Sequence, residues 1–228
     1  MIALDAIMIA VRYCTLCNQS GKDQVVNPLH LFDMGRWEPD AQSRLQLAAL
    51  DLFARRGYDN VTVAEIATAA GLTRRSFFNH FADKREILFA GANAFEESIV
   101  NYLHGLGSGD TALNSVVRAL TLAGLELSKY RDFAVLRQRL IASNVELRER
   151  ELVKMDSLAR AITIELTEMD VPKTEALLAS QIGISIFNIS YDQWVSRAGE
   201  DLVILMNENL AVVAKVFSNL PVQGLAGY

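Results

Sequence analysis

Three polar side chains close together in the chain have the chemistry needed to read a DNA sequence. Arg74, Arg75 and Asn79 lie within residues 73–80. Arginine carries a fork of donors that fits guanine edges or phosphate oxygens, and asparagine can pair with adenine. The same residues also fit the solvated surface of a two-helix hairpin, so their role depends on the elements that position them.

The pattern around these side chains predicts a helix, a tight turn and a second helix. Thr62 and Glu65 form a T-x-x-E capping box, which marks a helix start, and apolar residues follow at helical spacing. Gly71 is placed to end this helix, because glycine reaches the left-handed conformation without a Cβ penalty. Thr73 can cap the next helix. This order is that of a helix-turn-helix, whose second helix can enter the major groove of duplex DNA.

Two phenylalanines predict which face of the second helix is buried. Phe77 and Phe81 are four residues apart, so they fall on one side of the helix and can pack against the first helix. Arg74, Arg75 and Asn79 would then point away from this apolar contact.

Helices are also predicted on both sides of this pair. Residues 40–56 form an amphipathic pattern that Gly57 closes, and a longer helix is predicted over residues 83–104, with Asp83 as its cap. Lys84 lies in its first turn, where the helix dipole disfavours a cation. A bound phosphate would offset that cost, and a surface lysine with its ammonium in solvent is the alternative.

The unbroken block from Gly57 to Leu88 resembles the TetR family of bacterial repressors. The resemblance rests on Thr62-Val63-x-x-Ile66-Ala67, Ala70-Gly71-Leu72-Thr73 and Phe77-Phe78-Asn79-His80-Phe81. It implies an all-α homodimer. An N-terminal three-helix DNA-binding domain would contain the helix-turn-helix, and a larger C-terminal helical domain would bind ligand and dimerise.

The resemblance also implies which residues contact DNA, either to hold its backbone or to read its bases. They are Arg44, Thr62, Thr73, Arg74, Arg75, Ser76, Phe78, Asn79, His80 and Lys84. The family usually has tyrosine at the position of Phe78, so a hydroxyl group that could bind a phosphate is missing. Phe78 is left to pack against sugar and a thymine methyl group.

The rest of the chain is predicted to form further helices. Residues 1–34 are interpreted as a disordered extension or an upstream mis-start, because the chain from Met34 resembles the usual start of such proteins. The DNA-binding domain would cover residues 35–88, the C-terminal domain residues 89–220, and a loose tail residues 221–228.

The last two predicted helices, 174–197 and 200–218, carry more apolar surface than one ordinary core stripe. We expect them to form an isologous homodimer interface, and the alternative is an ordinary monomer core.

A ligand pocket is predicted among the middle helices, although aromatic residues at helical spacing are more often core. The candidate lining residues are Phe95, Tyr102, Met155, Phe187, Tyr191 and Trp194. Residues 137–162 also resemble a segment of actinobacterial members near the mycofactocin-biosynthesis regulator, some of which respond to fatty acyl-CoA thioesters. That resemblance implies a small apolar effector such as an acyl-CoA.

Motifs of other function classes are missing from the sequence. It has three histidines and neither an H-E-x-x-H, a G-x-S-x-G nor a G-x-x-x-x-G-K motif, so we predict no enzyme, no catalytic residue, no cofactor and no metal. Cys14 and Cys17 form a lone C-x-x-C with only His30 nearby, which favours reduced thiols. Since no apolar run reaches the ~18–20 residues of a membrane span, we expect a cytoplasmic protein.

Net charge does not decide the partner. The chain carries −5, but residues 35–90 hold eight basic and seven acidic side chains. We interpret the sequence as a ligand-gated repressor that binds a palindromic double-stranded operator. The alternatives are an enzyme and a helical lipid or acyl-CoA carrier with a vestigial DNA-binding head.

Overall fold

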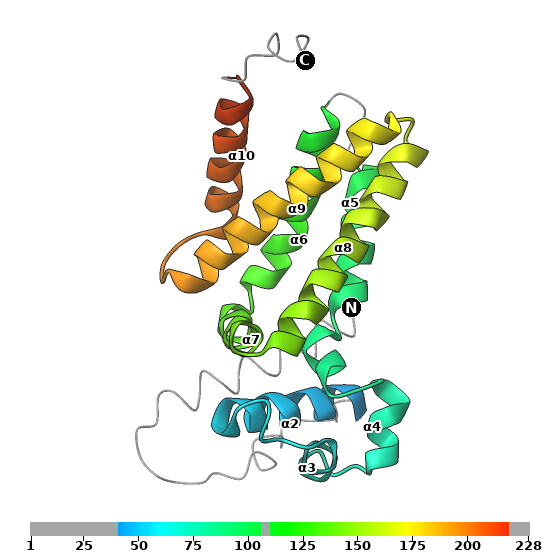
Figure 1. Ribbon diagram of the computed structural model, residues 1–228, viewed down its shortest axis with the longest axis vertical. Helices are drawn as coiled ribbons and strands as arrows, with labels where there is room; N and C mark the ends of the chain where they lie inside the picture. The colour runs from blue at the N-terminus through cyan, green and yellow to red at the C-terminus, as the bar shows by residue number, and fades with distance from the viewer. Residues whose placement is uncertain (1–40, 106–109, 219–228) are drawn as a thin grey trace, which may run out of the picture. The chain divides into compact units, whose positions relative to one another are not determined.

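The computed structural model describes residues 41–105 and 110–218, and every regular element in these ranges is helical (Figure 1). The predicted all-α class is confirmed. The predictions for Cys14, Cys17, His30 and both chain ends concern residues outside these ranges. The elements are α2 (Ala41–Arg56), α3 (Val63–Ala69), α4 (Arg74–His80), the 3-10 helix η2 (Arg85–Phe89), α5 (Ala92–Gly105), α6 (Ala112–Ser128), α7 (Arg131–Ser143), α8 (Val145–Glu168), α9 (Lys173–Ser196) and α10 (Leu202–Ser218).

The described residues form two compact units. Unit 1 contains residues 41–92 and 130–151, and unit 2 contains the described parts of 93–129 and 152–218. This division differs from the predicted boundary, which assigned all of 89–220 to one C-terminal domain. The reason is packing, because the apolar cluster of the helix-turn-helix also buries Leu140, Ile141 and Leu147.

The apolar cluster of unit 1 holds the three helices of the DNA-binding domain together. Phe53 of α2, Ile66 of α3 and Phe77 of α4 are at most 1% exposed. The rings of Phe77 and Phe81 lie 5.5 Å apart between centroids, and both are buried, as their spacing predicted. Full burial of such a side chain stabilises a fold by roughly 1.5–3 kcal/mol, so this cluster fixes the direction of α4.

The single helix predicted over residues 83–104 is wrong. Asp83 acts as a cap, since its Oδ1 accepts from the backbone N–H of Arg85 at 2.8 Å, but η2 ends at Phe89 and α5 begins only at Ala92. The carbonyl oxygen of Ile87 accepts from the Gln46 side chain, and that of Leu88 accepts from Arg137. Side chains of α2 and α7 thus bind carbonyl groups that a continuous helix would use internally.

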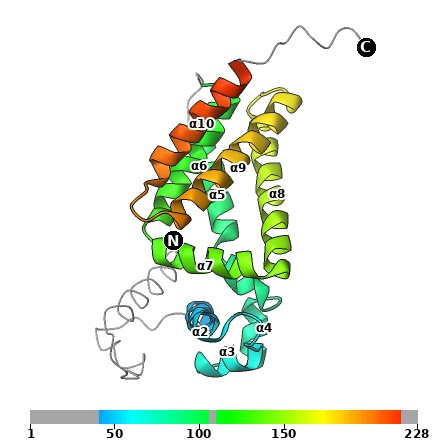
Figure 2. The ribbon, with the colours of Figure 1, turned by 60° about the vertical axis from the view of Figure 1, so that its left-hand side comes forward.

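Unit 2 is built around α6, α9 and α10, which pack against one another (Figure 2). Small residues allow the close approach, because a Cβ on Gly183 of α9 would clash with Val116 of α6. The predicted last two helices are confirmed as α9 and α10. Within residues 41–105 and 110–218, no helix has the length and apolar character to cross a membrane.

Candidate nucleic-acid interface

The turn between α3 and α4 is fixed by a glycine and an arginine. Gly71 has a φ of 66°, in the left-handed region that L side chains avoid. Arg44 on α2 donates through Nη2 to the carbonyl oxygen of Ala70 at 2.6 Å and so binds an otherwise unpaired carbonyl at the end of α3. A Cβ on Gly71 would lie 2.7 Å from Arg44 Nη2. Arg44 therefore holds the turn, and its contact with DNA stays a prediction.

Both helices of the motif begin at the predicted caps. Thr73 Oγ1 accepts from the backbone N–H of Ser76 at 3.0 Å. Thr62 and Glu65 form the complete capping box, in which Glu65 Oε2 accepts from the Thr62 backbone N–H at 2.8 Å and from its hydroxyl at 2.7 Å. These bonds, together with one from Arg56, lower the pKa of Glu65 to about 2. Thr62, Thr73 and Ser76, all predicted DNA contacts, are therefore ordered by the caps.

The outer face of α4 is polar, and the protein does not neutralise its cations. Its exposed polar side chains make no hydrogen bond or ion pair with any described residue; they are Arg74, Arg75, Asn79 and His80. Other arginines of the same domain have carboxylate partners, in the pairs Arg55–Asp51, Arg56–Glu65 and Arg85–Asp83. Free donors on one helix face suit a partner that supplies acceptors.

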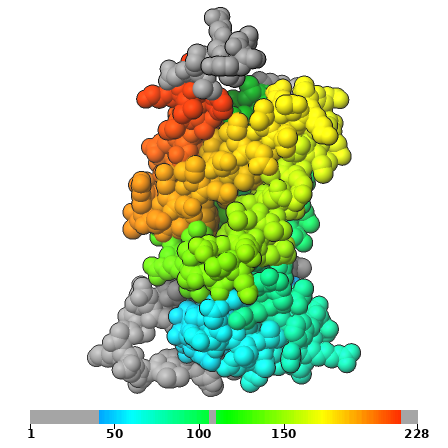
Figure 3. Space-filling model, viewed as in Figure 1, coloured from blue at the N-terminus to red at the C-terminus, as the bar shows by residue number. Residues whose placement is uncertain are grey.

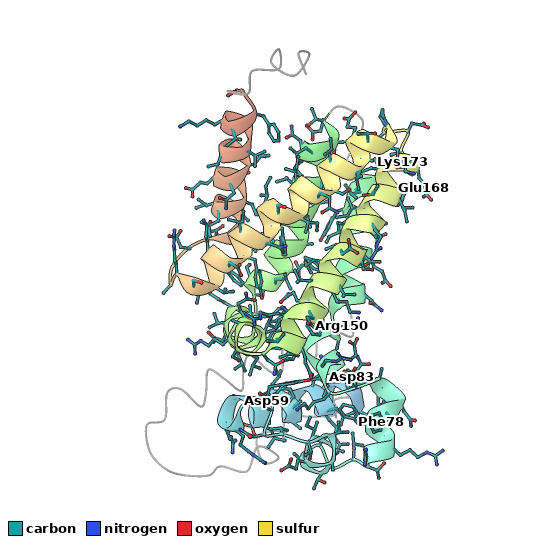
Figure 4. The ribbon with its side chains drawn as sticks, viewed as in Figure 1. Asp59, Phe78, Asp83, Arg150, Glu168 and Lys173 are labelled. Carbon is teal, nitrogen blue, oxygen red and sulfur yellow. The ribbon has the colours of Figure 1, made fainter. Side chains whose placement is uncertain are left out.

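Phe78 interrupts this polar face with an exposed aromatic ring. The residue is 46% exposed, and Figure 4 labels it on α4. Its ring meets the buried Phe77 ring edge-on, with centroids 5.3 Å apart and planes at 78°. On another side, Arg74 Cζ lies 5.6 Å from the Phe78 centroid. The ring is therefore held between a core phenylalanine and an unpaired guanidinium group.

Lys84 has a structural contact that the sequence did not predict. Its ammonium group donates to the carbonyl oxygens of Tyr58 at 2.8 Å and Val61 at 2.9 Å, and lies 4.0 Å from the Tyr58 ring centroid. Burial lowers the pKa of Lys84 and raises the pKa of Tyr58. Lys84 thus ties the start of η2 to the loop after α2, and its ammonium is not free in solvent. A contact with DNA, still a prediction, would use the remaining N–H.

Sequence reasoning missed the residues that fasten α7 and α8 to the DNA-binding helices within unit 1. Arg150 of α8 pairs with Glu86 of η2, and the Asn144 side chain donates to Asp59 Oδ1 at 2.8 Å. Arg137 of α7 also pairs with Glu151 of α8 at 3.0 Å. No local pattern could reveal the first of these pairs, because Arg150 and Glu86 are 64 residues apart.

The sequence of this helix-turn-helix matches a known family. Residues 47–90, which include α3, α4 and η2, match the sequence model of "Bacterial regulatory proteins, tetR family". Residues 47–90 are therefore similar to the DNA-binding domain of TetR-family regulators. The resemblance inferred from the capping box, the glycine turn and the phenylalanine run is confirmed.

Two curated relatives match this chain over part of its length. The HTH-type transcriptional regulator TcmR of Streptomyces glaucescens is 35% identical over 68 residues, which are 30% of this chain and 30% of TcmR. A Mycobacterium tuberculosis protein described as a mycofactocin biosynthesis transcriptional regulator, MftR, is 30% identical over 94 residues, 41% of this chain and 47% of MftR. The chain thus spans less than half the length of these curated relatives.

A solved structure shares the fold beyond the DNA-binding domain. The fatty acid degradation regulator FadR from Bacillus halodurans superimposes with a TM-score of 0.53 at 17% identity, over 78% of this chain and 96% of FadR. At this identity the likeness concerns the fold alone.

Most of the predicted ligand-binding residues lie together in unit 2. Ring centroids are 5.5 Å apart for Phe95 and Phe187, 5.9 Å for Phe187 and Tyr191, and 5.7 Å for Tyr191 and Trp194. We call these four residues the aromatic row. Tyr102 is half-buried and makes no ring contact among the described residues. Met155 is also half-buried, and ligand binding by all six stays a prediction.

A cavity of about 350 Å³ lies between α9 and α10, and none of the six predicted ligand residues lines it. Its walls include Ile189, Val212 and Phe217, which are more than half exposed. Asn209, also in the wall, donates to Ser190 Oγ at 2.9 Å. Figure 3 shows α9 and α10 at the surface of this face of unit 2. These helices therefore leave apolar surface that the described chain does not cover.

Proposed function

We propose that this protein is a DNA-binding transcriptional repressor that a small apolar molecule releases from its operator. The observation that carries the proposal is the face of α4, where Arg74, Arg75 and Asn79 are exposed, unpaired and held on a capped helix. These side chains match the guanine, phosphate and adenine groups that the major groove presents. We propose supporting DNA contacts, to bases or backbone, for Arg44, Thr62, Thr73, Ser76, Phe78, His80 and Lys84.

The proposed active form is a homodimer through α9 and α10. Apolar side chains on these helices are exposed by about half, among them Leu178, Ile189, Val212 and Val216. An uncovered apolar surface of this kind is typical of an interaction site, and the same surface on a second copy is the partner that two-fold symmetry supplies. Two reading helices related by a two-fold axis require a palindromic operator. Such a regulator works in the cytoplasm.

The proposed effector site is in unit 2, beside the aromatic row, Tyr102 and Met155. Aromatic walls with few polar groups suit an apolar ligand, and an acyl-CoA is the class that the sequence suggests. Residues 145–151 of α8 belong to unit 1 and its later residues to unit 2. One continuous helix could therefore carry a change at the effector site to the DNA-binding helices, to the extent that the ligand prefers one conformation.

The test is binding of the full chain to DNA fragments selected from the source genome. We expect a specific fragment, an affinity that falls as salt rises because phosphate contacts release counterions, and release by a long-chain acyl-CoA. Arg74→Ala should weaken specific binding by roughly 5- to 150-fold, the range of one lost base contact. Arg118→Ala removes the same charge from an exposed site in unit 2 and should leave binding unchanged.

Three results would contradict parts of this proposal. If no fragment is selected while acyl-CoA binds, the protein is a carrier with an inactive head. If a fragment is selected but Arg118→Ala weakens binding as much as Arg74→Ala, α4 does not read bases. If DNA binds and acyl-CoA has no effect, the effector class is wrong.

A further inference from the structure

We infer that Phe78 and Arg74 act together as one reading unit, which selects a thymine beside a guanine in each half-site. The inference rests on the proposed function, since it specifies which bases α4 recognises. It begins from the exposed ring of Phe78 and its contact with the Arg74 guanidinium group, which the sequence did not predict.

Phe78 has one chemical partner in the major groove. Within residues 41–92 it is the large apolar side chain that stays markedly exposed, at 46%. Its ring has no donor or acceptor, so it cannot hydrogen-bond a phosphate or a base edge. Among the groups that base pairs present in the major groove, the C5-methyl of thymine is the apolar one. An exposed phenyl ring on the reading face therefore selects thymine.

The ring is ordered before DNA arrives. Phe77, which is fully buried, packs against it edge-on, and the Arg74 guanidinium lies 5.6 Å from its centroid. The buried Phe77 ring limits the rotational freedom that the Phe78 ring has to lose on binding, and preorganisation of this kind raises affinity. Because Arg74 makes no hydrogen bond or ion pair with the described residues, its N–H groups remain available to guanine O6 and N7.

The spacing of the two residues places their targets next to each other. Arg74 and Phe78 are four residues apart on α4, a rise of about 6 Å along a helix. One base-pair step of duplex DNA rises about 3.4 Å. Two side chains that touch each other on this helix can therefore reach base pairs that are adjacent or, at most, two steps apart.

The experiment replaces single groups on the DNA. An operator is first obtained by selection of random duplexes with the full-length chain. Each thymine is then replaced by deoxyuridine, which lacks the methyl group, and each guanine by 7-deazaguanine, which lacks N7. We expect one thymine per half-site whose replacement weakens binding about fourfold, the factor for roughly 0.8 kcal/mol of one buried methyl-sized group. A guanine within two base pairs should be sensitive to loss of N7.

Protein variants assign these effects to the two side chains. In Phe78→Ala the deoxyuridine effect should disappear, while Phe78→Tyr keeps the ring and should retain it. Leu152→Ala, which trims an exposed apolar residue on α8, should leave the effect unchanged. Arg74→Ala should abolish the 7-deazaguanine effect. Circular dichroism melts of each variant establish that it is folded.

The outcomes separate this inference from the proposed function. Failure to select any duplex would overturn the DNA-binding role itself. A selected operator with no methyl-sensitive thymine, or one whose sensitivity persists in Phe78→Ala, would overturn only the thymine-reading role. Sensitive thymine and guanine more than two base pairs apart would show that the residues do not form one unit.

Discussion

The Arg137 side chain on α7 donates through Nε to the carbonyl oxygen of Leu88 at 3.0 Å, although the two residues are 49 positions apart. The same guanidinium pairs with Glu151 at 3.0 Å and lies 5.0 Å from the centroid of the Phe89 ring. One side chain of unit 1 therefore connects η2, α7 and the first turns of α8.

Arg137→Leu should destabilise unit 1. The substitution leaves the Leu88 carbonyl and the Glu151 carboxylate without their donor, and a polar group left unpaired in a partly buried site costs about 1–3 kcal/mol. We expect the free energy of unfolding in urea to fall by that amount. Arg139→Leu is the matched control, because Arg139 is exposed on the same helix and has no partner among the described residues. Equal losses for the two variants would contradict the connecting role of Arg137.

Gly71→Ala should destabilise the protein by more than the strained backbone conformation alone explains. A left-handed φ costs an L residue about 1–2 kcal/mol, and both Gly71 and Gly199 have such angles, 66° and 86°. A Cβ at Gly199 meets nothing within 4 Å, whereas one at Gly71 would displace Arg44 from the end of α3. Thermal unfolding should show a larger loss for Gly71→Ala, and only this variant should weaken DNA binding. Similar losses in stability would mean that the Arg44 contact contributes little.

The Glu65 carboxyl group makes the start of α3 sensitive to acid. Its pKa in the folded protein is about 2, against an ordinary value of 4.5. Because the folded-state pKa is lowered, its contribution to stability is complete above about pH 4.5 and is lost as pH falls towards 2. Thr62→Val removes the hydroxyl that binds the carboxylate, so the pKa of Glu65 should rise towards 4.5 in a carbon-detected NMR titration.

Thr68→Val serves as the control for this titration. Thr68 is also on α3, but its hydroxyl donates to the Ala64 carbonyl oxygen and to no carboxylate. The Glu65 pKa should therefore stay near 2 in this variant. A Glu65 pKa that is unchanged in Thr62→Val would show that the capping box does not cause the shift.

The parts of the fold that the sequence predicted correctly depend on neighbours along the chain. The capping box of Thr62 and Glu65, the turn at Gly71 and the buried pair Phe77 and Phe81 all involve residues within a few positions of one another. Helical spacing shows which face of a helix is apolar, and it correctly predicted the exposed side of α4. Helical spacing depends only on residues close together in the chain. It was therefore sufficient to predict that the candidate DNA-binding face of α4 is exposed.

The parts of the fold that the sequence could not predict depend on which helix faces pack against one another. Residues 130–151 follow α6 in the chain, yet Leu140, Ile141 and Leu147 pack in the cluster of the DNA-binding helices. The break after η2 has the same origin, since Arg137 binds a carbonyl group far away in the sequence. The sequence also did not predict that the Lys84 ammonium group donates to two backbone carbonyl groups instead of pointing into solvent. A single sequence gives amphipathic faces but not their partners.

The surface of α9 and α10 predicts how the protein assembles. Val212 is 57% exposed and lines the cavity between these helices, so Val212→Glu should not affect the folded monomer. A carboxylate at the centre of an apolar dimer interface would be desolvated without a partner, at a cost of several kcal/mol. Sedimentation velocity should therefore show a dimer for the natural sequence and a monomer for this variant. The monomer should also bind a palindromic operator more weakly, because the two reading helices are no longer linked in one dimer.

Ile164→Glu is the control, because it changes a similarly exposed residue, at 59%, on α8. This variant should remain a dimer. A dimeric Val212→Glu variant would place the interface on another surface of the protein.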